Sequence, residues 1–207
     1  MLAPSKLEEV FSKHLPANAV NPCLKLWEEK PFHFKITSSR KTKLGDFRYR
    51  KDQQFQTITL NADLNPYQFL LTFVHEVAHL HAFQKFGYAI APHGREWKST
   101  FQQLLFPFLM ENIFPIDILI PLKKHMRNPK ASSASDLFLM KEMSKYDKHL
   151  TGNATFFLSD LKPGSNFTIS GRVFRKGETR RTRVLCEEVN TGKKYLIAQL
   201  AKIQPLE

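Results

Sequence analysis

The sequence predicts an α+β fold, in which a small antiparallel sheet and a central helix form a core domain that is followed by a small C-terminal β module. Three observations support this prediction. Apolar residues recur at helical spacing in residues 65–86, alternate in short runs between residues 32 and 60, and return as short strand-like runs with turn signals between residues 156 and 203. A chain of 207 residues with 42% hydrophobic content is long enough to bury such a core.

The N-terminal part of the chain predicts one helix and three strands. The helix is expected to begin at Ser5, because Ser5 and Glu8 fit the capping-box pattern, and Pro16 should end it. Short alternating runs then predict strands of an antiparallel sheet at residues 32–36, 44–50 and 55–60, with a basic turn at 38–43.

The central helix has a strong start signal, because Asn65 can cap it and Pro66 suits the first helical position. The apolar residues that follow at helical spacing are Phe69, Leu70, Phe73, Val74, Val77 and Leu80. Gly87 lies where this helix should stop. A further helix is expected from about Arg95 to Met110, broken around Pro107.

The most apolar stretch, residues 104–122, contains acidic residues and three prolines, so we interpret it as buried globular segments and expect no membrane span. Residues 123–135 are polar and basic, which predicts a linker, and Asp136 is expected to cap a short helix to about Lys148. The predicted domains are therefore a core domain at 1–122, a basic linker with a short helix at 123–150, and a basic β module at 151–207.

The N-terminal ten residues lack the apolar core of a secretion signal, so a cytoplasmic location is expected, associated with the nucleoid if the protein binds DNA. Cys23 and Cys186 are far apart in the sequence and too few for a disulfide framework or a four-cysteine zinc site. We interpret them as free thiols.

The pentad His75-Glu76-Val77-Ala78-His79 lies inside the predicted central helix. Two histidines four residues apart are separated by about 40° of helical rotation, so both imidazoles can reach one ion from the same face. Glu76 lies between them, where its carboxylate can take a proton from water at the metal. The alternative, that the histidines merely pack on the helix, is disfavoured because a buried histidine needs a polar partner.

A catalytic zinc site needs a third protein ligand and an open position for water. The metzincin pattern is excluded, because this sequence has Ala82 and Lys85 where that pattern requires glycine and histidine. His93 is the leading candidate, since the following Gly94 permits a close approach of the backbone. Glu96 is the alternative third ligand.

The other histidines are not expected to bind the metal. His81 lies about 200° around the helix from His79, so it is interpreted as a surface or packing residue. The histidines without ligand spacing are His14, His33, His125 and His149. The sequence therefore predicts one zinc ion per chain.

Three motifs together resemble the SprT family of zinc metalloproteases (SprT/Spartan type). They are the helix start Leu64-Asn65-Pro66, the pentad at 75–79, and the later His93-Gly94 with Trp97. The segment 42–48 is also similar to the strand that precedes the catalytic helix in that family. The resemblance covers about residues 5–110 and implies a zincin-like fold.

This resemblance implies that His75, His79 and His93 hold the zinc ion and that Glu76 is the catalytic base. It also implies a role near DNA, in which proteins crosslinked to DNA are degraded. Many members end in a zinc ribbon with paired cysteines, whereas the basic segment here retains only Cys186. A second, structural zinc ion is therefore not expected.

The positive charge is concentrated late in the chain, because residues 1–122 carry 14 Lys/Arg against 11 Asp/Glu and residues 123–207 carry 17 against 8. This excess predicts a polyanionic partner, with nucleic acid favoured. The candidate binding residues are Arg172, Arg175, Lys176, Arg180, Arg181 and Arg183. They alternate with Phe167, Phe174 and Tyr195, which could stack on the bases of single-stranded DNA or could instead form the module's core.

The function expected from these patterns is zinc-dependent hydrolysis of peptide bonds, with DNA-bound proteins as substrates. One alternative is a nucleic-acid-binding protein whose zinc site is structural or vestigial, and Glu76 argues against it because a structural site has no use for that carboxylate. Another alternative, which the sequence leaves open, is a metal-dependent hydrolase that acts on a different substrate.

Overall fold

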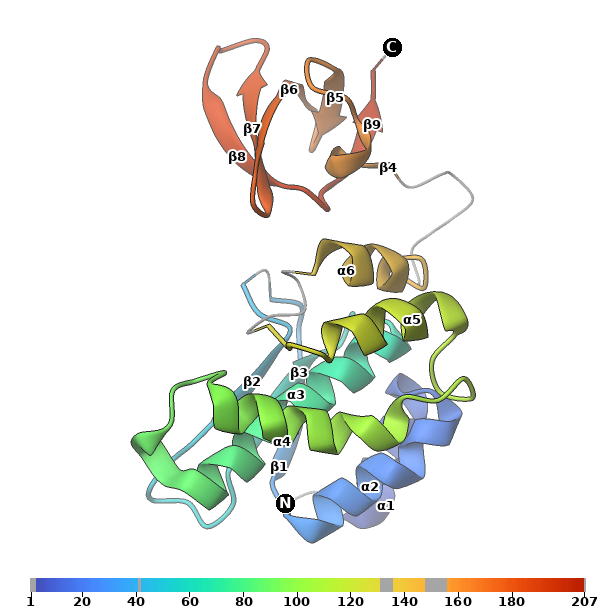
Figure 1. The fold of residues 1–207 in the computed structure, drawn as a ribbon, viewed down its shortest axis with the longest axis vertical. Coiled ribbons are helices and arrows are strands. Elements are labelled where there is room, and N and C mark those ends of the chain that lie inside the picture. The colour runs from blue at the N-terminus through green and yellow to red at the C-terminus, as the bar shows by residue number, and fades with distance from the viewer. Residues whose placement is uncertain (1–2, 41, 131–135, 148–155, 207) are drawn as a thin grey trace. The chain divides into compact units, whose positions relative to one another are not determined.

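The computed structural model describes residues 3–40, 42–130, 136–147 and 156–206, and its contacts divide the chain into two compact units, Met1–Lys148 and His149–Glu207. Figure 1 shows that helices surround a small sheet in the first unit and that the second unit consists mainly of strands. The predicted α+β class is confirmed.

The sheet of the first unit contains three strands, β1 (His33–Thr37), β2 (Gly45–Arg48) and β3 (Thr57–Asn61). Their order is β1-β3-β2, with β1 parallel to β3 and β2 antiparallel to β3. The prediction of a purely antiparallel sheet was therefore wrong. Because β3 inserts between two strands that are successive in the sequence, the sheet is mixed and β2 becomes an edge strand.

The central helix α3 (Pro66–Phe86) packs against β2 and β3. Its start is fixed as the sequence indicates, because the Asn65 side-chain oxygen accepts hydrogen bonds from the backbone N–H groups of Tyr67 (3.1 Å) and Gln68 (3.0 Å). The helix ends at Gly87, whose φ of 66° is a conformation that glycine adopts readily.

The described part of the first unit contains five further helices: α1 (Pro4–His14), α2 (Val20–Glu29), α4 (Arg95–Leu105), α5 (Ile116–His125) and α6 (Leu137–Ser144). Short 3-10 turns lie at Ala17–Ala19, Gly87–Ala89 and Phe106–Phe108. The expected capping box is not formed, because α1 begins at Pro4 and its N-cap, Ala3, offers no side-chain acceptor. No helix in the described ranges is long and apolar enough to cross a membrane.

The first unit extends beyond residue 122, where the sequence suggested that the core domain ends. Helix α5 continues to His125, and α6 contributes the buried side chains of Leu139 and Met143 to the core. A hydrogen bond of 2.9 Å from Asn65 Nδ2 to the carbonyl of Met143 also ties α6 to the start of α3. The polar, basic composition of this region therefore reflects its exposed faces, and residues 131–135 lie outside the described part of the chain.

Phenylalanines form the centre of the core between the sheet and α3. Phe11 of α1 packs edge-to-face on Phe34 of β1 and on Phe73 of α3, with ring centroids 5.4 and 5.0 Å apart. Phe69 of α3 packs on Phe34 in the same way, at 6.3 Å. These contacts hold α3 firmly against the sheet, and α3 carries the pentad.

The second unit is a six-stranded antiparallel sheet with the order β4-β9-β5-β6-β7-β8, as expected for a β module. The strands are β4 (Phe156–Phe157), β5 (Asn166–Ile169), β6 (Arg172–Arg180), β7 (Arg183–Glu188), β8 (Lys194–Ala198) and β9 (Lys202–Pro205), with a 3-10 turn at Leu158–Asp160. Its separate core consists of Leu158, Phe167, Phe174, Val184, Cys186 and Ile203. Cys23 and Cys186 are both buried free thiols.

Candidate metal centre

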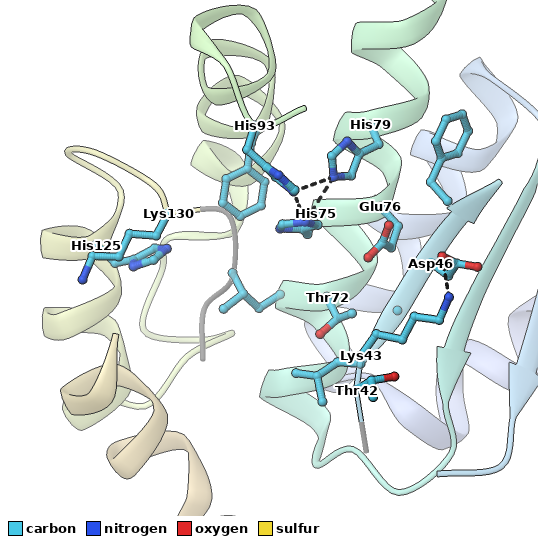
Figure 2. A pocket seen from close by; sticks show the side chains of 15 residues that line it. Thr42, Lys43, Asp46, Thr72, His75, Glu76, His79, His93, His125 and Lys130 are labelled. Atoms are coloured by element: carbon cyan, nitrogen blue, oxygen red, sulfur yellow. Dashed lines mark hydrogen bonds and ion pairs between the residues drawn. The ribbon is translucent and has the colours of Figure 1, made fainter. Parts of the chain in front are cut away.

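Three imidazole rings converge at one point beside α3, as Figure 2 shows. The Nε2 atoms of His75 and His79 are 3.2 Å apart, and the Nε2 atom of His93 lies 3.2 Å from the first and 2.9 Å from the second. Within the described ranges, no other group of three or more His, Cys, Asp or Glu side chains brings its ligand atoms this close together.

The spacing of these nitrogens fits a single bound ion. Three nitrogens that bind zinc at about 2.0 Å in tetrahedral geometry lie about 3.3 Å from one another. The observed separations of 2.9 to 3.2 Å are close to this value. The three-histidine cluster can therefore hold a metal ion.

His93 reaches the centre from the loop between α3 and α4 because its backbone is left-handed, with φ of 59°. This conformation costs a non-glycine residue about 1 kcal/mol, and residues held in it concentrate at functional sites. The next residue, Gly94, allows the loop to fold tightly, since a Cβ atom there would lie 2.9 Å from the carbonyl oxygen of Ala91.

Aromatic rings pack around the three imidazoles. The fully buried ring of Trp97 has its centroid 4.6 Å from His75, 5.2 Å from His79 and 4.7 Å from His93. Phe47 of β2 lies parallel to the His79 ring at 6.5 Å. This packing restricts the orientations of the three imidazole rings.

Burial keeps the three imidazoles neutral. It lowers the pKa of His75 to about 2, with smaller contributions from positive charge on His79 and His93. Burial also lowers the pKa of His79 to about 4 and that of His93 below its ordinary value. A neutral imidazole is the form that binds a metal, so the rings are in the correct protonation state at neutral pH.

The carboxylate of Glu76 lies beside this cluster and is 7% exposed. Burial raises its pKa to about 8, and the negative charge of Asp46 adds to this effect. A hydrogen bond from the backbone of Phe47 lowers the pKa of Glu76, and a bound cation would lower it too. The edge strand β2 thus holds the carboxylate through its backbone.

Gly45 makes this close approach of β2 possible. A Cβ atom at position 45 would lie 2.7 Å from Glu76 Oε1 and 2.7 Å from the Thr72 methyl group. Both distances are shorter than real Cβ contacts, so any side chain at this position would displace Glu76 or the strand.

The metal cluster opens into a pocket of about 380 Å³. Its lining comes from β2 and the segment before it, from α3 and α4, and from the region around the end of α5: Thr42–Phe47, Leu71, Thr72, His75, Glu76, His79, His93, Phe101, His125 and Lys130. His125 has no ligand spacing in the sequence, so its position at this pocket was missed.

The structure separates the other candidate ligands from the cluster. Glu96, considered as an alternative third ligand, is not part of it. His81 is half-buried, and burial lowers its pKa to about 4, but it does not line the pocket. His14 stacks on Phe69 at 4.9 Å, and His149 lies outside the described residues.

The candidate nucleic-acid residues of the second unit have different environments. Lys176 is buried, and its ammonium group donates to the carbonyl oxygens of Leu161 (2.6 Å) and Ser159 (3.4 Å), so it has a structural role. Arg172 forms an ion pair of 2.6 Å with Glu188. Exposed guanidinium groups that remain on β6, β7 and their connecting turn belong to Arg175, Arg180, Arg181 and Arg183.

The aromatic residues of this unit belong mainly to its core. Phe167 and Phe174 are almost fully buried and stack on each other at 5.8 Å, and Tyr195 packs edge-to-face on Phe174. Of the two roles that the sequence leaves open for these phenylalanines, the structure shows the role in the core.

The fold and the cluster define an α+β protein with a zincin-like metal centre, in which a helix supplies His75 and His79 and a following loop supplies His93. The model of the SprT-like family matches residues 17–113, which include all three histidines and Glu76. This part of the chain is similar to the SprT-like family, and this similarity suggests a metalloprotease-like role. No curated protein and no solved structure matched the chain.

We expect the purified protein to bind one zinc ion per chain. Replacement of His75, His79 or His93 by Ala should abolish tight binding, because two imidazoles leave the coordination incomplete. Metal content and titration with zinc would measure this effect.

Glu96→Ala and His81→Ala are the matched controls and should keep the ion, since neither side chain belongs to the cluster. Loss of zinc in Glu96→Ala together with its retention in His93→Ala would show that the third ligand is wrong.

Proposed function

We propose that the protein is a zinc metalloendopeptidase of the SprT type, in which His75, His79 and His93 hold one zinc ion and Glu76 is the general base. The observation that carries this proposal is the convergence of three imidazole nitrogens within 3.2 Å of one another, beside a buried carboxylate and an open pocket. A purely structural site would be closed by a fourth ligand and would have no use for that carboxylate.

The zinc ion and Glu76 have different roles in the proposed reaction. A bound zinc ion supplies Lewis-acid catalysis at the carbonyl group of the scissile peptide bond. Glu76 accepts the proton of the attacking water and then delivers it to the nitrogen of the departing amine. Burial raises the pKa of Glu76 and a zinc ion bound beside it would lower this pKa again, so the two opposing effects would suit the carboxylate to both accepting and delivering a proton.

Glu76→Gln tests this function most simply. Glutamine has the same size but cannot accept the proton, so zinc binding should persist while hydrolysis of a protein probe falls at least about 1000-fold. The assay should follow cleavage of a DNA-binding protein with and without DNA. A zinc-loaded Glu76→Gln variant that is as active as the wild type would contradict the assigned base.

Gly45→Ala should reduce hydrolysis while the zinc ion remains bound. The new methyl group would meet both Glu76 and Thr72 at 2.7 Å, and a displacement of a catalytic group by about 1 Å costs about 100-fold in rate. Steady-state kinetics and metal analysis would measure the two effects separately.

The double variant Gly45→Ala with Thr72→Ser separates catalysis from stability. It removes the methyl group of Thr72 but leaves the collision with Glu76, so it should recover thermal stability and not activity. Full activity in Gly45→Ala would show that the close approach of β2 has no role in placing the base.

We also propose that the substrates are proteins bound to DNA and that the chain itself binds DNA. The net charge of +12 supports this, and residues 149–207 contribute 10 Lys/Arg against 5 Asp/Glu. Arg180, Arg181 and Arg183 lie at the exposed turn between β6 and β7, where they can contact phosphates. Because the phenylalanines are in the core, phosphate contacts carry this proposal.

Binding of enzyme and substrate to one DNA molecule would raise their effective concentration to about the millimolar range for short flexible tethers. Colocalisation alone could therefore select the substrate, with no change in the metal centre. Single-stranded DNA remains our expected partner for stimulated cleavage, and a parallel assay with double-stranded DNA tests that preference directly.

Replacement of Arg180, Arg181 and Arg183 by Gln should weaken DNA binding and lower the slope of log Kd against log salt by about 2 to 3, since up to three phosphate contacts are lost. Fluorescence anisotropy at several salt concentrations would measure this slope. Replacement of three exposed lysines of the first unit, Lys6, Lys13 and Lys25, by Gln removes the same charge and is the control. Equal losses in both triple variants would mean that only net charge matters.

A further inference from the structure

A further ionisable side chain lines the pocket and is not used by the proposed chemistry. His125, at the end of α5, lines the pocket together with the metal cluster and Glu76. Figure 2 shows its ring across the pocket from His75 and Glu76. Both sides line the same pocket, so a substrate bound at the metal cluster can also meet His125.

The orientation of the His125 ring is fixed by Asp136. The side chain of His125 is 2% exposed, and its Nδ1 atom lies 3.0 Å from Asp136 Oδ2. A carboxylate can only accept, so Nδ1 donates this hydrogen bond. Nε2 is then the remaining polar atom of the ring, and in the doubly protonated ring it can donate to an oxygen atom in the pocket.

Asp136 is itself held in place. Its other carboxylate oxygen, Oδ1, accepts a hydrogen bond of 3.3 Å from the backbone N–H of Leu139 and so caps α6. Helices α5 and α6 are joined independently by a hydrogen bond of 3.0 Å from the hydroxyl group of Tyr146 to Asp117 Oδ1. The pair of His125 and Asp136 is therefore not needed merely to attach α6 to α5.

We propose that His125 is a further catalytic residue, which donates a hydrogen bond from Nε2 to the carbonyl oxygen of the scissile peptide bond as negative charge develops on that oxygen. Asp136 is the positioning residue that holds the ring. This role requires the doubly protonated ring, in which Nδ1 donates to the Asp136 carboxylate and Nε2 keeps its own proton, so no covalent step is added. This role rests on the proposed peptidase function and deepens it, because it assigns the second group that stabilises the transition state.

Two substitutions of similar size separate the two nitrogens of the ring. In His125→Asn, the amide can still donate to Asp136 but does not reach the position of Nε2. In His125→Gln, the longer amide can place a donor near that position. Asp136→Asn keeps an oxygen atom for the Leu139 N–H and removes the charge that orients the ring.

With fluorescein-labelled casein as the probe, His125→Asn should lower kcat about 100-fold, the effect of removing one transition-state donor, while KM changes less than about 3-fold. His125→Gln should recover about 10-fold of this loss, and Asp136→Asn should lower kcat about 10-fold. Zinc content should stay at one ion per chain, and the thermal midpoint shows which variants are folded. A folded, zinc-loaded His125→Asn variant with wild-type kcat overturns the proposal.

Binding of a phosphinic pseudopeptide gives a readout that does not depend on turnover. Its tetrahedral phosphinate resembles the transition state, so its Kd should rise about 100-fold in His125→Asn and stay unchanged in His81→Asn, whose ring does not line the pocket. Equal affinity for the wild type and His125→Asn overturns the proposal. If the wild type cleaves casein no faster than Glu76→Gln, the peptidase function itself fails, and the titration still decides whether His125 contacts a tetrahedral ligand.

Discussion

Three half-buried imidazole rings whose Nε2 atoms point at one another are the constraint on which the first unit depends. All three contacts join Nε2 atoms, and in a neutral ring Nε2 carries either a proton or a lone pair, so the three contacts cannot all be hydrogen bonds. A shared cation removes this conflict, since each lone pair then has a partner. The phenylalanine core, the capped start of α3 and the left-handed backbone of His93 all serve to hold the rings in this arrangement.

The edge strand β2 connects this metal cluster to the rest of the pocket. Because β3 occupies the centre of the sheet, β2 is free to approach α3 at Gly45 and to bind the Glu76 carboxylate through the Phe47 backbone. The same approach places Phe47 against His79. A mixed sheet of three short strands thus positions both the base and one ligand ring.

The local parts of this arrangement could be predicted from the sequence. The Asn65 cap, the Gly87 end of α3 and the four-residue spacing of His75 and His79 all depend on neighbouring residues. Helix α2 was missed although Val20, Cys23 and Trp27 recur at helical spacing and are buried.

The parallel pairing of β1 with β3 and the meeting of His125 with Asp136 depend on contacts between distant segments, which local patterns do not reveal. Lys176 was assigned to the binding surface because of its charge alone. The strand period of two places it on the same face as the buried Phe174, and this signal was readable in the sequence.

The proposed chemistry belongs to the first unit, whereas the proposed DNA contacts are spread over both units. The first unit contains the pocket and also carries much of the positive charge, since residues 123–148 belong to it and hold 7 Lys/Arg against 3 Asp/Glu. The second unit has its own small core and presents Arg180, Arg181 and Arg183 at one exposed turn. DNA affinity is therefore expected from both units.

X-ray absorption spectroscopy of the zinc-loaded protein reports the ligand atoms of the metal. A three-histidine centre should show three imidazole nitrogens and one oxygen atom from water, all at about 2.0 to 2.1 Å. A sulfur ligand at about 2.3 Å, or fewer than three imidazoles, would contradict the three-histidine centre.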